Sequence, residues 1–597
     1  MKFFRTFLAS LLGTLAGLFL LFIIMFAVLL SSSGESEPYV RSNTVLTMDI
    51  SGDIPARASI DPFEELFSSS PNPRFSLETL KNNLEKAADD DNISAVWVKT
   101  NMVTASWANL ESAYNYFEEY RKSGKPLYFS TDDIGMNEKS YFLATLADSI
   151  FTPPATNFEF DGFVGQFTFY RPMLEKIGIE PEIFRVGKYK SAIEPFTNVE
   201  SSPESIEQMT LILTQASDLF INAVARRLDR SPEEVHDMLN TPPVDRLQYA
   251  LEHNLIDAFA YEDEVEMHIK NRIGVDEEDD MRTINFGRYN RVSNSRAGVD
   301  LPKSDNKIAV IYSAGMILPE MAQSPFSTSS GITPENVQKQ FERALDDENV
   351  KAIVLHIDSP GGSATSSDLI WNTIRKASEE MPVIASMGSV AASGGYYMAA
   401  AADTIVASDN TITGSIGIFS VLFNAQELLN DKIGIRNQTI KTHHYADLFD
   451  LTRPFTEAEE TILQQNIESG YELFLSRVAE GRNMSRDEVH EHAQGRVFTG
   501  ADAYDVGLVD VIGDLDKAII IAAEMAEVEE YNLEVFPKST DFFEMMFSSA
   551  NARIRASVQG WIPQELNQTK SAQNIMELLN QPAGHNWVLL PGYFDVY

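Results

Sequence analysis

Residues 351–363, KAIVLHIDSPGGS, decide how the rest of the chain can be interpreted. The first seven form a short apolar strand, and they lead directly into Asp358, Ser359 and Pro360, followed by two glycines. Glycines directly after a strand let backbone N–H groups point at a ligand with no Cβ in the way. The stretch therefore predicts a buried strand that ends in a ligand-binding loop.

The segments around this stretch alternate between strand-like and helix-like patterns. Short apolar runs at 307–312 and 383–386 flank it, and segments 334–346 and 366–378 are helix-like stretches between the runs. Strands that alternate with helices of about 10 to 15 residues are typical of a parallel sheet. We therefore predict an α/β fold.

The pattern occurs twice in the chain. Residues 84–96, LEKAADDDNISAV, resemble residues 341–353, FERALDDENVKAI, at an offset of 257 residues. Three further matches follow in the same order, and the offset falls only to 253: 176–179 with 432–435, 231–236 with 485–490, and 254–257 with 507–510. Four collinear matches predict a tandem duplication of one α/β domain.

The composition excludes several classes of function. The 597 residues include 47 Lys and Arg against 87 Asp and Glu, a formal charge of −40, which disfavours nucleic acid as a partner. The absence of cysteine removes disulfides, thiolate nucleophiles and cysteine-ligated metals. There is no P-loop or dinucleotide fingerprint, and His443, His444, His490 and His492 lack the i, i+4 spacing of a zinc site. We expect no cofactor and no metal.

The N-terminus predicts a membrane anchor. Lys2 and Arg5 precede an uncharged run at 7–30, which as a helix would span roughly 36 Å, enough to cross a bilayer core. The run lacks a clear small-x-small cleavage site, so we favour an uncleaved anchor over a cleaved signal peptide. The two basic residues predict a cytoplasmic N-terminus, with the remainder of the chain on the outer side of the cytoplasmic membrane.

These patterns divide the chain into seven parts. The predicted parts are a cytoplasmic N-terminus at 1–6, a transmembrane anchor at 7–30, a tether at 31–44, an N-terminal repeat at 45–275, a polar linker at 276–306, a C-terminal repeat at 307–537 and a tail at 538–597.

The candidate nucleophile is a serine at the end of a strand. Residues 387–397, MGSVAASGGYY, place Ser393 between an apolar strand and a helix-forming stretch, among residues small enough for a substrate backbone to approach. A helix N-terminus favours the negative charge that develops on a reacting group. For Ser393 alone, a helix N-cap is the more common role.

The two copies differ at the positions that carry chemistry. At an offset of 256 or 257, Ser393 falls on Asn137, and the glycine pair falls on Thr104 and Ala105. Conversely, Lys190, in GKYKSAIEPF, falls on no lysine of the second copy. Each copy therefore holds half of a site, with a candidate nucleophile in one and a candidate base in the other. The halves meet either within one chain or between neighbouring chains of an oligomer.

Four motifs together resemble the long form of bacterial signal peptide peptidase, also called protease IV: LHIDSPGGS, SVAASGGYY, TITGSIGIFS and GKYKSAIEPF. The resemblance extends to the anchor, the duplication and the overall length. It implies a Clp protease/crotonase-like fold, a homotetramer, and a membrane-anchored Ser–Lys peptidase that degrades cleaved signal peptides and other short apolar peptides on the periplasmic side of the inner membrane. By the motif match, Ser393 is the nucleophile, Lys190 the general base, Gly362 and Gly394 the oxyanion hole, and Ser415 the residue that orients the lysine.

A lysine base imposes a requirement on its surroundings. At its usual pKa of about 10.4 a lysine is protonated at neutral pH, so burial must lower the pKa of Lys190. We therefore expect apolar cover over its amine, with the nearby Glu194 pointing away. Lys188 is the rival base by proximity, and its alternative role is that of an exposed loop residue.

Other functions remain open at this point. His356 invites a Ser-His-Asp arrangement, but the chain has no G-x-S-x-G elbow. An acyl-CoA enzyme would use Gly361 and Gly362 to hold a thioester oxyanion, although it has no evident need for Lys190. A non-catalytic anchored scaffold would use the same motifs for packing.

Overall fold

The computed structural model describes most of the chain beyond the N-terminus. The described residues are 13, 14, 17, 37–58, 75–132, 134–241, 245–299, 302–319, 331–538 and 587–589. Among them, no helix has both the length and the hydropathy needed to cross a membrane. The predicted anchor at 7–30 lies outside the described residues, apart from residues 13, 14 and 17.

The first copy is built on a six-stranded parallel sheet. Its strands lie in the order β6-β4-β3-β2-β1-β7. They are β1 (Thr44–Gly52), β2 (Ile93–Val103), β3 (Leu127–Thr131), β4 (Ser149–Thr152), β6 (Ala258–Phe259) and β7 (Arg282–Asn285). Its helices include α3 (Leu77–Asp89), α4 (Trp107–Arg121), α5 (Glu138–Ala144), α6 (Arg171–Ile177), α7 (Glu194–Thr197), α9 (Pro232–Leu239), α10 (Arg246–Glu252) and α11 (Glu262–Ile273).

The second copy contains the same six-strand arrangement within a larger, eight-stranded sheet. The strands β16-β12-β11-β9-β8-β17 pair in parallel, in the same order as their counterparts. The strands are β8 (Lys307–Ala314), β9 (Val350–Ser359), β11 (Val383–Ala392), β12 (Thr404–Ala407), β16 (Val511–Ile512) and β17 (Asn532–Phe536). The helices of this copy include α13 (Pro334–Leu345), α14 (Ala364–Ser378), α15 (Gly394–Ala399), α17 (Arg486–His492), α18 (Gly500–Asp505) and α19 (Leu515–Met525). The predicted tandem duplication of an α/β domain is confirmed.

The predicted linker at 276–306 contributes more structure than its polarity indicates. Its residues include β7, which pairs with β1, and helix α12 (Phe286–Asn290), so the first sheet extends beyond the predicted repeat boundary. Strand β7 lies at the sheet edge, and of its four residues only Ile284 is buried. An edge strand with one buried residue carries no alternating pattern by which the sequence could reveal it.

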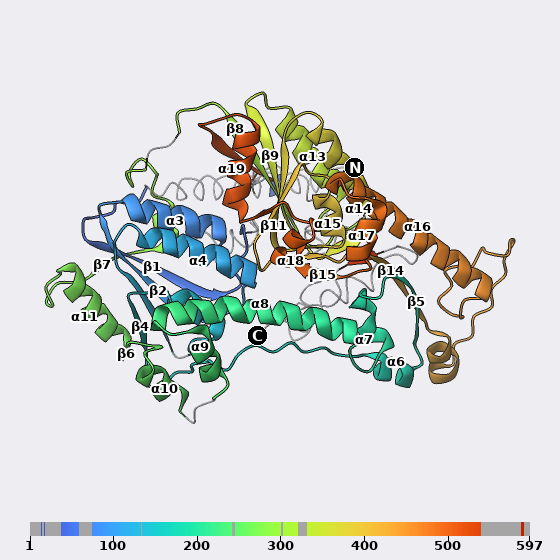
Figure 1. Cartoon of the computed structure of the whole chain (residues 1–597), viewed down its shortest axis with the longest axis horizontal. Helices are drawn as coiled ribbons and strands as arrows, with labels where there is room; N and C mark the ends of the chain where they lie inside the picture. Colours follow the sequence, from blue (N-terminus) through green and yellow to red (C-terminus); the bar gives the residue numbers. More distant parts are fainter. Residues whose placement is uncertain are drawn as a thin grey trace, which may run out of the picture.

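A long helix ties the two copies together. Helix α8 (Pro203–Leu228) belongs to the first copy and has its counterpart in α16 (Glu457–Arg482) of the second, and each has 26 residues. Figure 1 shows α8 passing under both copies, from the first sheet toward β15 (Val497–Thr499). Gln208 on α8 accepts a hydrogen bond from the Val497 N–H at 2.6 Å. The helix therefore fixes the first copy against the second.

A third sheet combines strands from both copies. It has the order β10-β18-β14-β5 and contains β10 (Gly361–Ser363), β18 (Trp587–Leu589), β14 (Ile418–Asn424) and β5 (Glu180–Val186). Strand β5 of the first copy pairs antiparallel with β14 of the second over all seven residues. Of the predicted tail at 538–597, the structure describes residue 538 and β18. This sheet carries the C-terminal end of β5, and the residues after it, to the carboxyl ends of the strands of the second copy.

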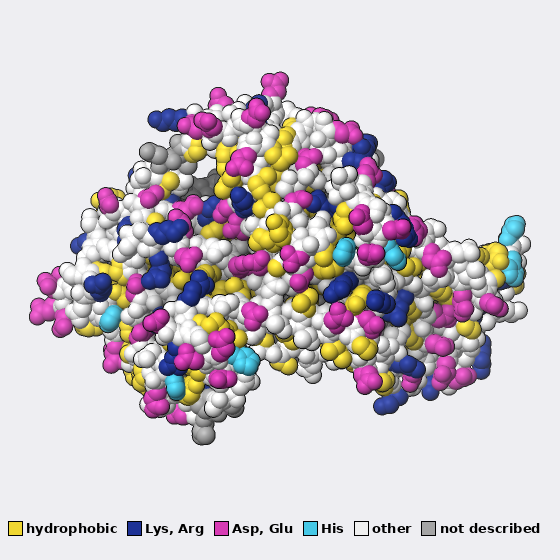
Figure 2. Space-filling model, in the orientation of Figure 1, with side chains coloured by type: hydrophobic (Ala, Val, Ile, Leu, Met, Phe, Trp, Pro, Cys, Tyr) yellow, Lys and Arg dark blue, Asp and Glu magenta, His cyan; other side chains and the backbone are white. Residues whose placement is uncertain are grey.

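The high negative charge is spread over the visible surface. Figure 2 shows acidic side chains over the whole of one face, interspersed with basic ones rather than gathered in a single patch. The charge on this face therefore singles out no binding surface.

Candidate active site

Ser393 lies at the junction between β11 and α15. It is fully buried, with a φ of 55°, a backbone conformation that is costly for a residue other than glycine. It holds the N-cap position of α15, but its side chain makes no capping hydrogen bond. Its N–H donates to the Gly414 carbonyl at 2.8 Å. The strained junction therefore leaves the hydroxyl available to another partner, so Ser393 occupies the N-cap position without capping the helix through its side chain.

That partner is Lys190 of the same chain. Lys190 follows β5, and its Nζ lies 2.8 Å from Ser393 Oγ. The same Nζ lies 3.0 Å from the Ser415 carbonyl oxygen and 2.9 Å from Ser415 Oγ. The two half-sites predicted from the sequence are therefore brought together within one chain.

Burial controls the protonation of this lysine. Lys190 is fully buried, and loss of hydration lowers its pKa well below the usual value for a lysine. As expected, the Glu194 carboxylate is engaged elsewhere, because it accepts hydrogen bonds from Ser202 N–H at 3.1 Å and Ser202 Oγ–H at 2.6 Å. Lys188 is exposed, with its ammonium 4.8 Å from the centre of the Tyr189 ring. Lys190 is therefore the lysine at Ser393.

Two glycines make room for the lysine side chain. A Cβ added at Gly417 would lie 3.3 Å from Lys190 Cδ, and one added at Gly495 would lie 2.7 Å from Lys190 Cβ. Tyr189 N–H donates to the Gln494 carbonyl at 3.0 Å, which fixes the backbone just before the lysine. Sequence reasoning missed Gln494 and Gly495, since nothing in the sequence near residue 494 indicates contact with a segment 300 residues earlier.

The glycine loop meets the serine junction beside the nucleophile. A Cβ at Gly394 would lie 3.1 Å from Gly361 Cα, so the backbones of the two motifs touch. Gly362 has a φ of 158°, and a Cβ there would lie 2.0 Å from the Ile317 carbonyl oxygen. Ser363 N–H donates to that same carbonyl at 2.8 Å. The structure thus brings the glycine loop that contains Gly362 against Gly394, the residue that follows Ser393.

Ser415 is held in a conformation that turns two acceptors toward Lys190. Its φ is 51°, and its N–H donates to the Arg496 carbonyl at 2.6 Å. With its own carbonyl oxygen and hydroxyl both within 3.0 Å of Nζ, it contacts the amine more extensively than Ser393 does. This geometry matches the orienting role that the family resemblance implies for Ser415.

A slot one strand wide lies next to this site. Strand β18 fills it: Gly361, Gly362 and Ser363 pair antiparallel with Leu589, Val588 and Trp587. On the other side, Phe419 of β14 pairs antiparallel with the same segment. The glycine loop and β14 therefore present facing backbone edges that an extended peptide segment can join as a middle strand.

The remaining candidates lie elsewhere. His356 Nδ1 is 3.1 Å from Ser386 Oγ, so the imidazole is engaged away from Ser393. In the first copy, Asn137 caps α5 by accepting from Ser140 N–H at 3.1 Å, so the counterpart of the nucleophile has a structural role. Among the described residues, no group of three or more His, Asp or Glu could hold a metal ion.

Comparisons with known proteins match both copies. The model of peptidase family S49 matches residues 119–276 and 375–529, which contain Lys190 and Ser393 respectively, and the Clp protease model matches residues 332–412. The chain is 34% identical over 491 residues to the chloroplastic serine protease SPPA of Arabidopsis thaliana, covering 82% of this chain and 70% of that protein. It is 30% identical over 594 residues to Protease 4 of Salmonella typhi, covering 95% of this chain and 93% of that protein. A putative signal peptide peptidase SppA of Enterococcus faecium is 32% identical over 217 residues, covering 36% of this chain and 63% of that protein.

Proposed function

This chain belongs to peptidase family S49 and is a serine peptidase, and from that premise we propose that Ser393 is its nucleophile and Lys190 its general base. The family resemblance inferred from the sequence motifs is confirmed, so the acyl-CoA and scaffold alternatives fall away. The observation that carries the proposal is the 2.8 Å contact between Lys190 Nζ and Ser393 Oγ at a fully buried lysine.

The reaction begins with a proton transfer to the neutral amine. A neutral lysine has two N–H groups, which the oxygens of Ser415 accept, and one lone pair, which accepts the Ser393 hydroxyl proton. As Ser393 Oγ bonds to the peptide carbonyl carbon, Nζ takes this proton. It then gives the proton to the departing amine when the C–N bond breaks. Water repeats the sequence on the acyl-enzyme and releases the acid and the free serine.

The developing oxyanion needs donors that are in place before the reaction. We assign this role to backbone N–H groups at Gly362 and Gly394, which lie on the two motifs that meet beside Ser393. Fixed donors of this kind stabilise the tetrahedral intermediate without reorganisation, and each contributes a factor of about 10² to 10³ in rate.

The proposed substrates are cleaved signal peptides and other short apolar peptides. An extended peptide would take the place of β18 and pair with the backbone edges of Gly361–Ser363 and β14. Main-chain pairing accepts any sequence that can extend, and side-chain pockets then select among them. The predicted anchor at 7–30 would hold the peptidase at the outer face of the cytoplasmic membrane, close to where signal peptides are released.

The test of the dyad measures cleavage of an apolar fluorogenic peptide by the full chain. We expect Ser393→Ala and Lys190→Met each to lower kcat/KM by at least about 10³-fold, because they remove the nucleophile and its base. Lys188→Met is the matched control and should retain activity. A Lys190→Met variant that cleaves at the wild-type rate would overturn the proposal.

The substrate class and the location have separate tests. A peptide with charged side chains on both sides of the scissile bond should be cleaved at least tenfold more slowly than the apolar one. Equal rates would contradict the substrate assignment. A chain lacking residues 7–30 should move from the membrane to the soluble fraction, and an unchanged distribution would contradict the anchor.

We also propose that the chain forms a homotetramer through its duplicated architecture. The segment between β14 and α16, residues 425–456, projects to the edge of the molecule and is called the arm below (Figure 1). At an offset of 256, β5 corresponds to residues 436–442 of this arm. The counterpart of β14 is 162–168, which forms no strand. If the arm of one chain paired with 162–168 of the next, as β5 pairs with β14, the contacts would be heterologous, and a rotation of 90° between neighbours would close a ring of four chains.

Exposed apolar side chains on the arm support this assembly. Ile440 is 92% exposed, and Ile435 and Tyr445 are nearly half exposed. Ile440→Asp should therefore reduce the molar mass measured by light scattering, whereas Leu369→Asp, on the exposed face of α14, should not. An oligomer that is insensitive to Ile440→Asp would exclude the arm as the interface.

A further inference from the structure

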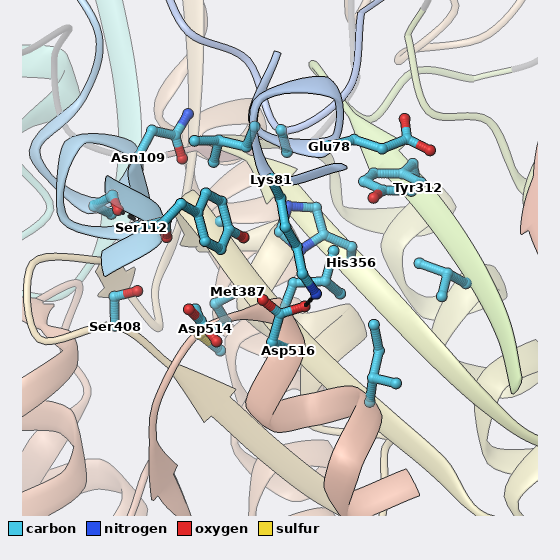
Figure 3. Close-up of a pocket in the computed structure, with 18 of the residues that line it drawn as sticks. Glu78, Lys81, Asn109, Ser112, Tyr312, His356, Met387, Ser408, Asp514 and Asp516 are labelled. Carbon is cyan, nitrogen blue, oxygen red and sulfur yellow. Dashed lines mark hydrogen bonds and ion pairs between the residues drawn. The ribbon is translucent and has the colours of Figure 1, made fainter. Parts of the chain in front are cut away.

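A second cavity lies between the two copies, apart from Ser393 and Lys190. Its volume is about 270 Å³, and its walls come from α3 and α4 of the first copy and from β8, β9, β11 and α19 of the second. Neither Ser393 nor Lys190 lines it. Figure 3 shows the His356 ring in the middle of the lining residues, with Asp514 and Asp516 on one side and Glu78 and Tyr312 on the other.

His356 presents an unused nitrogen to this cavity. The residue is 6% exposed, and among the described residues its Nε2 has no hydrogen-bond partner, although it lines the cavity. In the tautomer in which Nδ1–H donates to Ser386 Oγ at 3.1 Å, Nε2 is an acceptor. A Cβ at Gly388 would lie 3.1 Å from Nε2, so the glycine leaves space beside this atom. A buried acceptor without a partner is costly, and a ligand N–H would satisfy it.

The charged residues around the cavity favour one sign of charge on the ligand. Three carboxylates line it, those of Glu78, Asp514 and Asp516, against one ammonium, that of Lys81. Lys81 is already paired with Asp516 and lies 3.6 Å from Glu85. Arg57 lies 3.4 Å from Glu78. Lys81 and Arg57 together carry two positive charges against the three carboxylates of the lining, so the lining keeps an excess of negative charge. An anion is therefore disfavoured and a cation is attracted.

The aromatic and apolar residues of the cavity wall indicate the chemical class of the ligand. Tyr116 contributes an aromatic ring whose face attracts a cation, whereas Arg57 already lies over the Tyr312 ring, 5.5 Å from its centroid. Apolar surface comes from Val310, Leu515 and Ile519. Such a lining combines acceptors, negative charge and apolar cover, and a hydrated metal ion would not use the apolar part. We propose that this cavity binds a small organic cation, an ammonium group on an apolar body, with its N–H groups directed at His356 Nε2 and the nearby carboxylates.

The test is a calorimetric titration of the full chain with 2-phenylethylammonium. Its matched ligands are 2-phenylethanol, which has the same body without charge, and 3-phenylpropionate, which carries the opposite charge. We expect the ammonium to bind at least tenfold more tightly than the alcohol, and the carboxylate to show no binding. Equal affinities for the ammonium and the alcohol would overturn the proposal.

Two variants assign the binding to this cavity. Asp514 accepts from Lys517 N–H at 3.2 Å as the N-cap of α19, so Asp514→Asn removes the charge and keeps the cap. Its control is Asp245→Asn, at the N-cap of α10, outside the cavity lining. The first should weaken ammonium binding at least fivefold and the second should leave it unchanged. His356→Phe, which removes Nε2, should also weaken it. Affinities that neither Asp514→Asn nor His356→Phe changes would place the probe elsewhere and refute the site.

Discussion

At the scale of single residues, the unusual feature is a fully buried lysine that has no carboxylate partner in the part of the chain that the structure describes. Among the described residues, the hydrogen-bond partners of the Lys190 amine are neutral oxygens, those of Ser393 and Ser415, and burial lowers its pKa. A nearby carboxylate would have restored the ammonium form and removed the base. The bonding of Glu194 to Ser202 is therefore as necessary to the proposed chemistry as the contact with Ser393.

This arrangement makes the stability of the fold depend on pH in a defined direction. Between the lowered folded pKa of Lys190 and the unfolded value of about 10.4, the unfolded chain binds one more proton at this lysine, so its burial destabilises the fold below pH 10.4. Lys190→Met removes this cost. We expect the variant to raise Tm at pH 7 by about 3 °C or more, and the difference to shrink by pH 10.5.

The measurement is a pair of thermal unfolding series, across pH, for the variant and the wild type. Lys188→Met is the control, because Lys188 is exposed and its removal should leave the pH dependence unchanged. A Tm difference for Lys190→Met that stays constant from pH 7 to 10.5 would show that Lys190 keeps an ordinary pKa in the folded chain.

At the scale of elements, the site depends on one strand crossing from the first copy to the second. Strand β5 pairs with β14 over its whole length, and the segment after it lies against Gln494 and Gly495. The sequence predicts β8, β9 and β11, the central strands of the second sheet, because each contains a continuous apolar run. It does not predict β5, in which only Phe184 is buried, or the three-residue strands β10 and β18. Pairing between distant edges leaves no periodic pattern in either partner.

The contact between Gly495 and Lys190, the residue that β5 brings to the site, leads to a prediction. Gly495 has a φ of 81°, and an added Cβ would lie 2.7 Å from Lys190 N and Cβ, so Gly495→Ala must displace the lysine. Gly507 is the matched control, because its φ is 77° and nothing lies within 4 Å of an added Cβ. Both variants carry the same backbone strain, about 1 kcal/mol, but only Gly495→Ala should reduce kcat, by about 10²-fold. Equal losses of kcat would trace the effect to strain.

At the scale of the whole molecule, the residues of the candidate site are divided between the two copies. The second copy holds Ser393, the glycine loop and Ser415, while the first lacks the serine nucleophile and the glycine pair and presents Lys190. The motif comparison between copies predicts this division. The route by which the halves meet was left open by the sequence, since contact within a chain and contact between chains place the same residues together.

The geometry within one chain yields a test by complementation. If Lys190 reaches Ser393 only in its own chain, mixing a Ser393→Ala chain with a Lys190→Ala chain creates no intact site, since each chain lacks one of the two groups. We therefore expect the co-expressed, co-purified variants to stay as inactive on an apolar fluorogenic peptide as either alone. A site shared between chains would instead restore about a quarter to a half of wild-type activity, because mixed neighbours would pair an intact Lys190 with an intact Ser393. Tagging the two variants differently and purifying through both tags ensures that mixed oligomers are measured, and recovered activity in that fraction would refute the intrachain dyad.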